Sequence, residues 1–323
     1  MHKKNILVVG GAGFIGSHVN KMLHQAGYHT VVLDDLSQGN RKTVVHGVFI
    51  EGDMGDTPLL QNIFAEHAID AVMHFAAFTD IGESVALPLK YYNNNVVKTL
   101  NLLEVMQHFS IKVFIFSSTA AIFGLPQESR ITETHPCRPI NPYGHSKLMI
   151  ETILCDLDHA HAMRSCCLRY FNAAGGDPEG EIKRFKRKES NLIPVILNNL
   201  KHSEGKVTIF GSDYSTPDGT CIRDYIHIED LGKAHIIVME KLLNGAPSSC
   251  YNLGNGHGFS VRQVIAAISR VTGREIHIIE GARRIGDPPI LVANAQKAHR
   301  ELHWQPQYAS LEVMIQHAWH AMR

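Results

Sequence analysis

The stretch Ile6-Leu-Val-Val-Gly-Gly-Ala-Gly-Phe-Ile-Gly16 decides the fold class of this chain of 323 residues. Its apolar start predicts a short buried strand, and the apolar spacing over 15–25 predicts a helix. Gly10, Gly13 and Gly16 lie between the two. Glycines permit a tight turn and a close approach of the backbone to a pyrophosphate. The N-terminus of the following helix also favours binding of this anion. The stretch therefore predicts the strand–turn–helix unit of a dinucleotide-binding domain, with a purely structural glycine turn as the alternative.

A carboxylate follows each of the next two expected strands. Asp34 ends the strand expected at 30–33, 18 residues after Gly16. A carboxylate at this place accepts hydrogen bonds from both ribose hydroxyls and repels a 2′-phosphate, so NAD is favoured over NADP. Asp53 follows the strand expected at 48–50 and is placed to meet the adenine edge, although an aspartate in an ordinary turn remains the alternative.

The first half of the chain alternates short apolar runs with helical patterns, which predicts a parallel sheet covered on both faces. Further strands are expected up to His74-Phe75, at 113–116 and at 165–168, and helices at 59–66, 89–108 and 143–159. The predicted class is α/β, a Rossmann-type doubly wound parallel sheet over residues 1–171. Residues 172–323 are expected to form a smaller mixed α/β substrate-binding domain, with elements around 228–254 crossing back to the first lobe.

Tyr143 and Lys147 lie four residues apart, which places both on one face of a helix. A free tyrosine has a pKa of about 10, too high for a base at neutral pH. An adjacent ammonium, or a nicotinamide cation, favours the phenolate and lowers that pKa. The pair is therefore expected to transfer protons during hydride chemistry.

The balance of charges and the residue usage argue against several classes of protein. The 31 basic and 31 acidic residues cancel, which argues against a dedicated nucleic-acid binder. No stretch approaches the roughly 18 apolar residues of a membrane helix. Six cysteines without a C-x-x-C pattern indicate a reduced cytoplasmic protein. His299/His303 and His317/His320 have helical spacing, but no cysteine or carboxylate completes a site, so no metal is expected.

These motifs resemble the extended short-chain dehydrogenase/reductase family and, within it, the NAD-dependent epimerase/dehydratase enzymes. The resemblance covers nearly the whole chain. Its general motifs are the glycine turn at 10–16, His-Phe-Ala-Ala at 74–77, Ile-Gly-Glu-Ser at 81–84, Tyr-Tyr-Asn-Asn-Asn at 91–95, Phe-Ser-Ser-Thr-Ala-Ala-Ile-Phe-Gly at 116–124, Tyr-Gly-His-Ser-Lys at 143–147 and Arg-Tyr-Phe-Asn at 169–172. Its more specific motifs are Arg-Asp-Tyr-Ile-His at 223–227, Tyr-Asn-Leu-Gly at 251–254 and Arg-Arg-Ile-Gly-Asp-Pro at 283–288.

The resemblance implies inversion of C4 in a UDP-hexose. Tyr143 would take the proton of the sugar 4-hydroxyl while hydride passes from C4 to tightly bound NAD. The 4-keto sugar would then turn about its link to the diphosphate, and proton and hydride would return on the other face. Thr119 would hydrogen-bond the same oxygen, and Lys147 would bind the nicotinamide ribose. UDP-glucose and UDP-galactose are the expected pair, with the N-acetylated pair as a possible addition.

The resemblance also implies two sets of contacts. Positions matching cofactor contacts are Gly10, Gly13, Phe14, Ile15, Gly16, Asp34, Asp35, Leu36, Asp53, Met54, Phe75, Ala76, Ala77, Asn95, Thr119, Tyr143, Lys147 and Phe171. Positions matching nucleotide-sugar contacts are Thr119, Tyr143, Asn172, Asn191, Phe210, Arg223, Arg284, Asp287 and Leu291. Two arginines suit a diphosphate, because a guanidinium binds phosphate oxygens in a bidentate way.

Certain positions narrow the reaction. Ala120 follows Thr119 where related dehydratases carry an acid, which disfavours a dehydratase. Leu291 occupies a position where a bulky tyrosine is thought to exclude N-acetylated sugars and a small residue to admit them, so a leucine does not decide. The basic run at 183–188 is expected to be a solvated loop, with a partner-binding patch as the alternative.

Two other functions stay open from the sequence. One is a different nucleotide-sugar oxidoreductase, such as a uronate 4-epimerase or a 4-keto reductase. The other is a non-catalytic NAD-binding scaffold, because fold alone does not prove function. The family also leads to the expectation of a homodimer through helices near 90–108 and 143–159, whose apolar stripes could equally be buried within one subunit.

Overall fold

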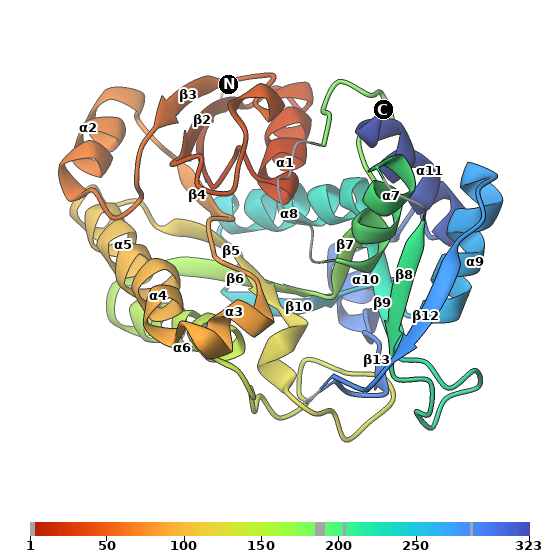
Figure 1. Ribbon diagram of the computed structural model, residues 1–323. Coiled ribbons are helices and arrows are strands. Elements are labelled where there is room, and N and C mark those ends of the chain that lie inside the picture. Colours follow the sequence, from red (N-terminus) through yellow and green to blue (C-terminus); the bar gives the residue numbers. More distant parts are fainter. Residues whose placement is uncertain (1–3, 185–190, 203–204, 285–286) are drawn as a thin grey trace. The chain divides into compact units, whose positions relative to one another are not determined.

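The computed structural model describes residues 4–184, 191–202, 205–284 and 287–323 (Figure 1). The chain forms two compact units. Unit 1 comprises Met1–Gly124, Cys137–Arg169 and Gly232–Tyr251, and unit 2 comprises Leu125–Pro136, Tyr170–Leu231 and Asn252–Arg323. Residues 125–136, which the sequence analysis placed in the first lobe, belong to unit 2. The reason is that Ile131 forms backbone hydrogen bonds with Val292 (2.9 Å) and Asn294 (2.8 Å) of that unit.

A seven-stranded sheet in the order β10-β6-β5-β4-β1-β2-β3 forms the centre of unit 1. Its strands are β1 (Asn5–Val9), β2 (His29–Asp34), β3 (Val48–Glu51), β4 (Ala71–His74), β5 (Val113–Thr119), β6 (Arg164–Tyr170) and β10 (Ser249–Leu253). Strands β3, β2, β1, β4 and β5 pair in parallel, with Val9 opposite both Leu33 and His74. This order is that of the doubly wound dinucleotide-binding fold, so the predicted fold class is confirmed.

Helices cover both faces of this sheet. They are α1 (Phe14–Gln25), α2 (Thr57–His67), α3 (Ile81–Ala86), α4 (Pro88–Tyr92), α5 (Lys98–His108), α6 (Pro142–His161) and α8 (Ile228–Leu243). Apolar residues of α2, α5 and α6 pack in one core with alternate residues of the strands, such as Leu7 and Val9. On α8, Gly232 lies against the Met22 sulfur of α1, so these two helices pack closely. The close-packed helices and sheet hold the carboxyl ends of the strands in place.

The predicted helix over 89–108 is correct in extent but not regular. Residues Asn93–Val97 form a π-helical turn between α4 and α5. A π turn widens the helix locally, and such turns are frequent at functional sites. It places Asn95 inward, where the side chain is 2% exposed and bonded to the backbone of Phe78. The period of the apolar residues alone does not show this insertion.

Unit 2 is a smaller mixed α/β body. Its remaining elements are β7 (Asn172–Ala174), α7 (Leu192–His202), β8 (Lys206–Phe210), β9 (Ile222–His227), β11 (Gly258–Ser260), α9 (Val261–Thr272), β12 (His277–Gly281), β13 (Ile290–Leu291), α10 (Gln296–Leu302) and α11 (Leu311–Met322). Strand β9 pairs with β7, β11 and β13, so segments far apart in sequence meet along it. Helices α7, α9 and α11 share one apolar core with this sheet. Unit 1 also contains short 3₁₀ turns at Arg41–Thr43 and Ala120–Phe123.

Candidate active site

The glycine turn lies between β1 and α1 and has no room for side chains. Gly10 has φ +80°, and a Cβ there would lie 2.4 Å from Ala76 N. A Cβ on Gly16 would lie 2.3 Å from Gly10 O. Phe14 and Ile15 begin the helix, whose N-cap residue Gly13 leaves the first backbone N–H groups without a capping side chain. This cradle fits the predicted pyrophosphate, because its backbone can approach closely and the helix N-terminus favours an anion.

Asp34 ends β2 beside this turn, as predicted. Its carboxylate accepts from Ala12 N (2.9 Å) and from Leu36 N (2.9 Å), and these bonds fix its orientation. Burial raises the pKa of the Asp34 carboxyl, while the two backbone hydrogen bonds lower it. Each carboxylate oxygen keeps a second lone pair that can accept from a ribose hydroxyl. Leu36 itself adopts φ 57°, which turns the chain after the strand.

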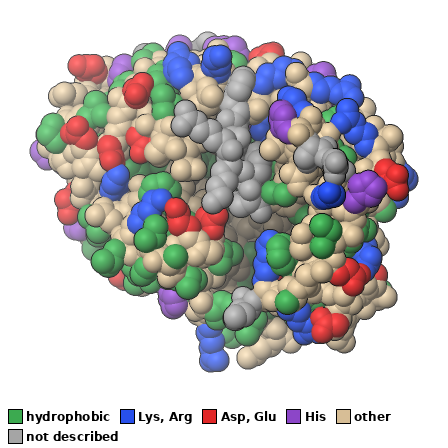
Figure 2. All heavy atoms as spheres, viewed as in Figure 1, with side chains coloured by type: hydrophobic (Ala, Val, Ile, Leu, Met, Phe, Trp, Pro, Cys, Tyr) green, Lys and Arg blue, Asp and Glu red, His purple; other side chains and the backbone are tan. Residues whose placement is uncertain are grey.

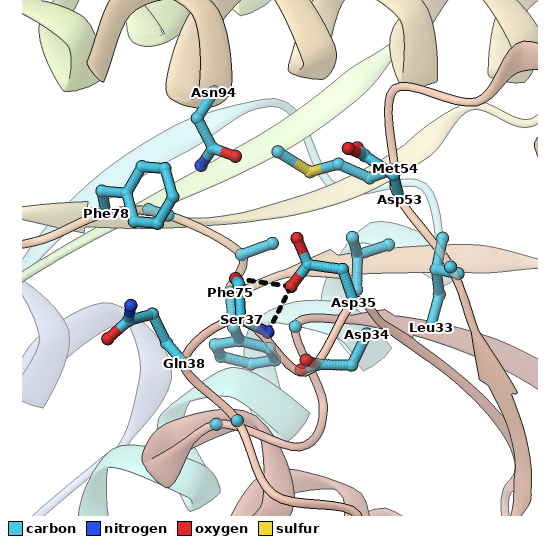
Figure 3. Close-up of a pocket in the computed structure, with 17 residues that line it drawn as sticks. Leu33, Asp34, Asp35, Ser37, Gln38, Asp53, Met54, Phe75, Phe78 and Asn94 are labelled. Carbon is cyan, nitrogen blue, oxygen red and sulfur yellow. Dashed lines mark hydrogen bonds between the residues drawn. The ribbon is translucent and has the colours of Figure 1, made fainter. Parts of the chain in front are cut away.

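A pocket at the carboxyl ends of the strands in unit 1 is lined by half of the predicted cofactor residues (Figure 3). The predicted residues that line it are Gly10, Gly13, Asp34, Asp35, Asp53, Met54, Phe75, Ala76 and Ala77. Ser37, Gln38, Gly39, Phe78 and Asn94 also line it and were missed by the sequence analysis. In Figure 3, Phe78 and Asn94 approach from one side and Met54 from the other. The pocket therefore offers an apolar slot for a planar group, with carboxylates at the edge of the slot.

Local turn chemistry explains three of these missed residues. Asp35 Oδ1 accepts from the backbone N (2.9 Å) and the hydroxyl (2.6 Å) of Ser37, shown dashed in Figure 3. This Asx turn carries the chain around the pocket to Gln38 and Gly39. The short Asp35-Leu-Ser37 sequence could have indicated the turn, but not that the chain then lines the pocket.

Asp53 pairs with a lysine that the sequence analysis did not single out. Its carboxylate accepts from the Lys98 ammonium and from Gly55 N (2.7 Å). Burial opposes ionisation of Asp53, but these bonds outweigh it and hold the pKa below its ordinary value. Asp53 is therefore ionised at neutral pH and available as an acceptor at the rim of the pocket.

Asn95, a predicted cofactor contact, is turned to the protein in this structure. Its Oδ1 accepts from Phe78 N (2.9 Å), and its Nδ2 donates to Phe78 O (3.0 Å) and to Ser146 Oγ (3.2 Å). The neighbouring Asn94 lines the pocket and donates to Asn95 Oδ1 (3.1 Å). Asn95 thus fixes the Phe78 wall of the pocket rather than lining it.

The proton-transfer residues come from β5 and α6. Thr119 is the last residue of β5, and its side chain hydrogen-bonds the Tyr143 side chain. Asn141 caps α6 by accepting from Gly144 N (2.8 Å). Gly144 is required here, because a Cβ would lie 2.6 Å from Ala121 O. The start of α6 can therefore approach the end of β5, which brings Tyr143 to Thr119.

Lys147 follows one turn later on α6 and is almost fully buried. Its ammonium donates to Ser117 O (2.8 Å) and lies 4.7 Å from the centre of the Phe116 ring. Burial lowers the pKa of Lys147 to about 7, while the Glu151 carboxylate opposes this change. Burial raises the pKa of the Tyr143 phenol, and the Thr119 hydrogen bond lowers it. The predicted lowering of the phenol's pKa by Lys147 is therefore not seen, because among the described contacts the ammonium bonds the strand.

Apart from Thr119 and Tyr143, the predicted nucleotide-sugar residues belong to unit 2. Arg223 on β9 donates to Pro288 O (2.8 Å), and its Nη2 lies 3.3 Å from Asp287 Oδ1. Leu291 on β13 is paired with Arg223 in the parallel register. The guanidinium of Arg284 lies 4.1 Å from the centre of the Phe210 ring. Unit 2 thus presents two arginines, a carboxylate and an aromatic ring on neighbouring segments.

Three other predicted residues have simpler environments. Asn172 on β7 donates to Asp224 O (2.9 Å), which ties it to β9. Asn191 is exposed just before α7, and Phe171 donates its backbone N–H to Leu253 O (3.4 Å). Of the basic run at 183–188, residues 185–188 lie outside the described residues.

The described part of the chain offers neither a metal cluster nor a membrane-spanning helix. Those residues contain no cluster of three or more His, Cys, Asp or Glu side chains suited to a metal. His317 instead lies 3.0 Å from His227, ring nitrogen to ring nitrogen. No helix among them is long and apolar enough to cross a membrane.

Comparisons with known proteins identify the family of this chain. The model of the NAD dependent epimerase/dehydratase family matches residues 6–254. A UDP-glucose 4-epimerase of Halalkalibacterium halodurans is 47% identical over 97% of this chain and 94% of its own length. A UDP-glucose 4-epimerase from Brucella ovis, solved in complex with NAD, has a TM-score of 0.95 and 43% identity, with 98% of this chain and 97% of that chain covered. The UDP-Glc/GlcNAc 4-epimerase from Campylobacter jejuni has a TM-score of 0.86 and 40% identity, with 98% and 99% covered.

Proposed function

Because the chain belongs to the NAD dependent epimerase/dehydratase family, we propose that it inverts C4 of a UDP-hexose and interconverts UDP-glucose and UDP-galactose. The observation that carries the proposal is the hydrogen bond between Thr119 and Tyr143, with Lys147 one helical turn away. A tyrosine with a lysine one helical turn away suits the removal of a hydroxyl proton. The full-length relatives named as 4-epimerases support this reaction over a dehydratase, a reductase or a scaffold.

Each residue of the site has a separate task. Tyr143 accepts the proton of the sugar 4-hydroxyl and later returns it, and Thr119 holds the same oxygen by a hydrogen bond. Lys147 holds a ribose hydroxyl and contributes positive charge beside the phenol. NAD held in the cradle would supply a reversible hydride acceptor for C4. Since burial raises the pKa of Tyr143 in the protein alone, positive charge at the site is needed to make it a base near neutral pH.

The cofactor and substrate groups have different candidate holders. The glycine turn and Asp34 suit the pyrophosphate and adenosine ribose of NAD. In unit 2, Arg223 and Arg284 suit the diphosphate of the UDP-sugar. Phe210 offers a ring face and Asp287 an acceptor nearby.

The test is incubation of the purified protein with each of the four UDP-sugars, without added NAD, followed by chromatography. We expect UDP-glucose and UDP-galactose to interconvert, because the tightly bound cofactor is regenerated in each turnover. Absence of the 4-epimer from all four reactions would reject the proposal. NAD released by denaturation in an amount equal to the protein would separately exclude an exchanging reductase.

Activity on the N-acetylated pair is a second candidate. The support is the likeness to the UDP-Glc/GlcNAc 4-epimerase, since Leu291 by itself does not decide. We expect slower conversion of UDP-GlcNAc than of UDP-glucose, and the same chromatographic assay measures both rates.

We also propose a homodimer through α3, α4 and α6. Several apolar side chains on these helices or next to them are exposed, with Leu89 81% and Val85 63% exposed, and Met149 45% exposed on α6. Figure 2 shows hydrophobic side chains among charged ones over the region where Figure 1 places α3 and α4. Light scattering should give twice the mass of one chain, and Leu89→Asp should shift the protein to monomer.

The compartment is proposed from the cysteines. All six lie in the described part of the chain and all are free thiols. Free thiols are typical of reducing compartments. We therefore place the protein in the cytoplasm, and fractionation of cells that make it would check this.

A further inference from the structure

A buried charge network lies one helical turn beyond Lys147 in unit 1. Glu151 follows Lys147 by four residues on α6, as Lys147 follows Tyr143, so the three side chains share one face of the helix. The Glu151 carboxylate accepts from Arg169 Nη2 (2.6 Å) and Nε (3.1 Å) and from Ser118 Oγ (2.5 Å). The Arg169 and Glu151 side chains are only 9% and 7% exposed.

This network meets the same three strand residues that organise the proton-transfer site. On β5, Ser117 O accepts from Lys147, Ser118 donates to Glu151, and Thr119 bonds Tyr143. Three successive residues of the strand are thus tied to three successive turns of α6. Glu151 thus contacts Ser118, the residue between the Ser117 carbonyl that accepts from Lys147 and Thr119.

Most of the ionisable groups around Lys147 are neutral. From β4, His74 faces it, and burial together with the lysine's charge lowers the pKa of His74 to about 3, so that ring is neutral. From β6, burial raises the pKa of Cys167 well above its ordinary value, and that thiol is also neutral. Cys137, beside Glu151 and Arg169, is likewise neutral because burial raises its pKa.

The remaining charges are then those of Lys147, Glu151 and Arg169, with Cys250 as a further thiol near Arg169. Glu151 is the one anion among them. Burial opposes the charge on Arg169, but its bonds to Glu151 outweigh burial and raise the pKa of the guanidinium. The Glu151 carboxylate therefore stabilises two buried cations. It contacts Arg169 directly, and it acts on Lys147 electrostatically across one helical turn.

We propose that Glu151, held by Arg169 and Ser118, is a positioning residue of the proton-transfer site, which keeps the Lys147 ammonium charged and aligns it with Thr119. This inference rests on the proposed function and extends it to residues that need not touch the substrate or the cofactor. The ion pair is more than a link between α6 and β6, because its carboxylate also bonds the strand next to Thr119.

The experiment compares Glu151→Gln with Glu151→Asp, since the first removes the charge and the second keeps it. We expect the high-pH limb of the kcat profile to move to lower pH by about one unit in Glu151→Gln and to stay in place in Glu151→Asp. Ser118→Ala, which keeps both charges, should lower kcat by about tenfold with the limb unmoved, since it removes one hydrogen bond that aligns the strand.

A matched control lies on the same two elements. Asp158 on α6 pairs with Arg164 on β6 (2.7 Å), but this pair is more exposed, at 17% and 44% of the two side chains. Asp158→Asn should leave the pH profile unchanged. Equal profiles for Glu151→Gln and wild type would overturn the proposal. If Glu151→Gln does not fold, the other two variants decide. A wild-type kcat in Ser118→Ala, or a shifted high-pH limb in Glu151→Asp, would overturn the proposal.

A second readout does not depend on turnover. The fraction of NAD retained through gel filtration is measured by denaturation and chromatography across the same pH range. Because Lys147 is proposed to hold a cofactor ribose, Glu151→Gln should lose NAD at lower pH than Glu151→Asp, and coincident retention curves would count against the proposal. If wild type converts none of the UDP-sugars, the proposed function fails, and this retention arm still tests Glu151.

Discussion

Unit 1 and unit 2 present their candidate residues in different ways. In unit 1 the polar side chains are bonded to their own backbone or to each other, as Asp34 is to Ala12 and Leu36, and Lys147 to Ser117. In unit 2 the charged residues lie on neighbouring segments with partners that are partly open to solvent. Asp287 beside Arg223 is 37% exposed in its side chain, and Phe210 beside Arg284 is 42% exposed.

The difference teaches how each unit meets its ligand. A site whose side chains are already fixed binds without the cost of ordering them, which suits a cofactor that stays bound. A site with open side chains can exchange partners at each turnover. Substitutions in unit 1 should therefore damage chemistry or cofactor retention, and those in unit 2 should change the affinity for the sugar nucleotide.

The largest effect should follow Tyr143→Phe in unit 1. Removal of the phenolic oxygen removes the proton acceptor, so kcat should fall by about 10²- to 10⁴-fold. Retention of NAD should persist, because the cradle is unchanged. Tyr28→Phe is the control, since Tyr28 bonds Glu240 (2.8 Å) outside the site and should keep full activity. Turnover at the wild-type rate in Tyr143→Phe would contradict the proposed chemistry.

Next is Gly10→Ala in the glycine turn. The positive φ costs roughly 1–2 kcal/mol for a side chain. The Cβ would also meet Ala76 N at 2.4 Å, which adds an overpacking cost of about 1–3 kcal/mol. We expect Tm to fall by about 5–15 °C and NAD to be lost on purification.

Gly27→Ala separates the two causes of that effect. Gly27 has φ +89° with nothing within 4 Å of an added Cβ, so only the backbone strain applies. Its Tm should fall by about 2–8 °C, with NAD retained. Equal losses of Tm and NAD in both variants would show that the close approach to Ala76 is unimportant.

In unit 2, Arg223→Gln should change binding rather than chemistry. A charge-assisted hydrogen bond contributes about 1.5–3 kcal/mol, so KM for UDP-glucose should rise by about 10- to 100-fold. The NAD content should stay at the wild-type level, and kcat should change little. Arg270→Gln, which breaks an exposed pair with Glu312, is the control. A large fall in kcat with unchanged KM would mean that the two units do not divide the work as proposed.

The smallest effect should be one of selectivity at Leu291. Leu291→Tyr should lower the ratio of kcat/KM for UDP-GlcNAc to that for UDP-glucose by about tenfold, because bulk costs roughly 1–3 kcal/mol in a pocket. Leu291→Ala should raise the same ratio. Ile290 points to the opposite side of β13, so Ile290→Ala should leave the ratio unchanged. An unchanged ratio in both Leu291 variants would remove this residue from the sugar site.

The predictions from sequence succeeded where local rules determine structure. The glycine turn, the strand that ends at Asp34 and the helix that carries Tyr143 and Lys147 all occur as expected. Parallel strands direct their carboxyl ends to one edge of the sheet, and Asp34 and Asp53, which follow two of these strands, line one pocket.

Other features were outside the reach of such rules. The π turn at Asn93–Val97 does not alter the apolar pattern enough to be seen, so Asn94 was missed as a pocket residue. The assignment of 125–136 to unit 2 depends on backbone bonds to residues more than 150 positions away. Lys147 was expected to lower the pKa of the Tyr143 phenol, but its ammonium donates to the Ser117 carbonyl, and burial raises that pKa in the protein alone.

By itself the sequence determined that a dinucleotide cradle precedes a tyrosine–lysine helix, because glycine spacing and helical periodicity are properties of neighbouring residues. Only the tertiary structure decided which charged and polar groups form one hydrogen-bonded network. Glu151, Arg169 and Ser118 come from three different elements, and burial together with their short contacts makes them one network. Their coupling depends on distance and desolvation, which no spacing along the chain expresses.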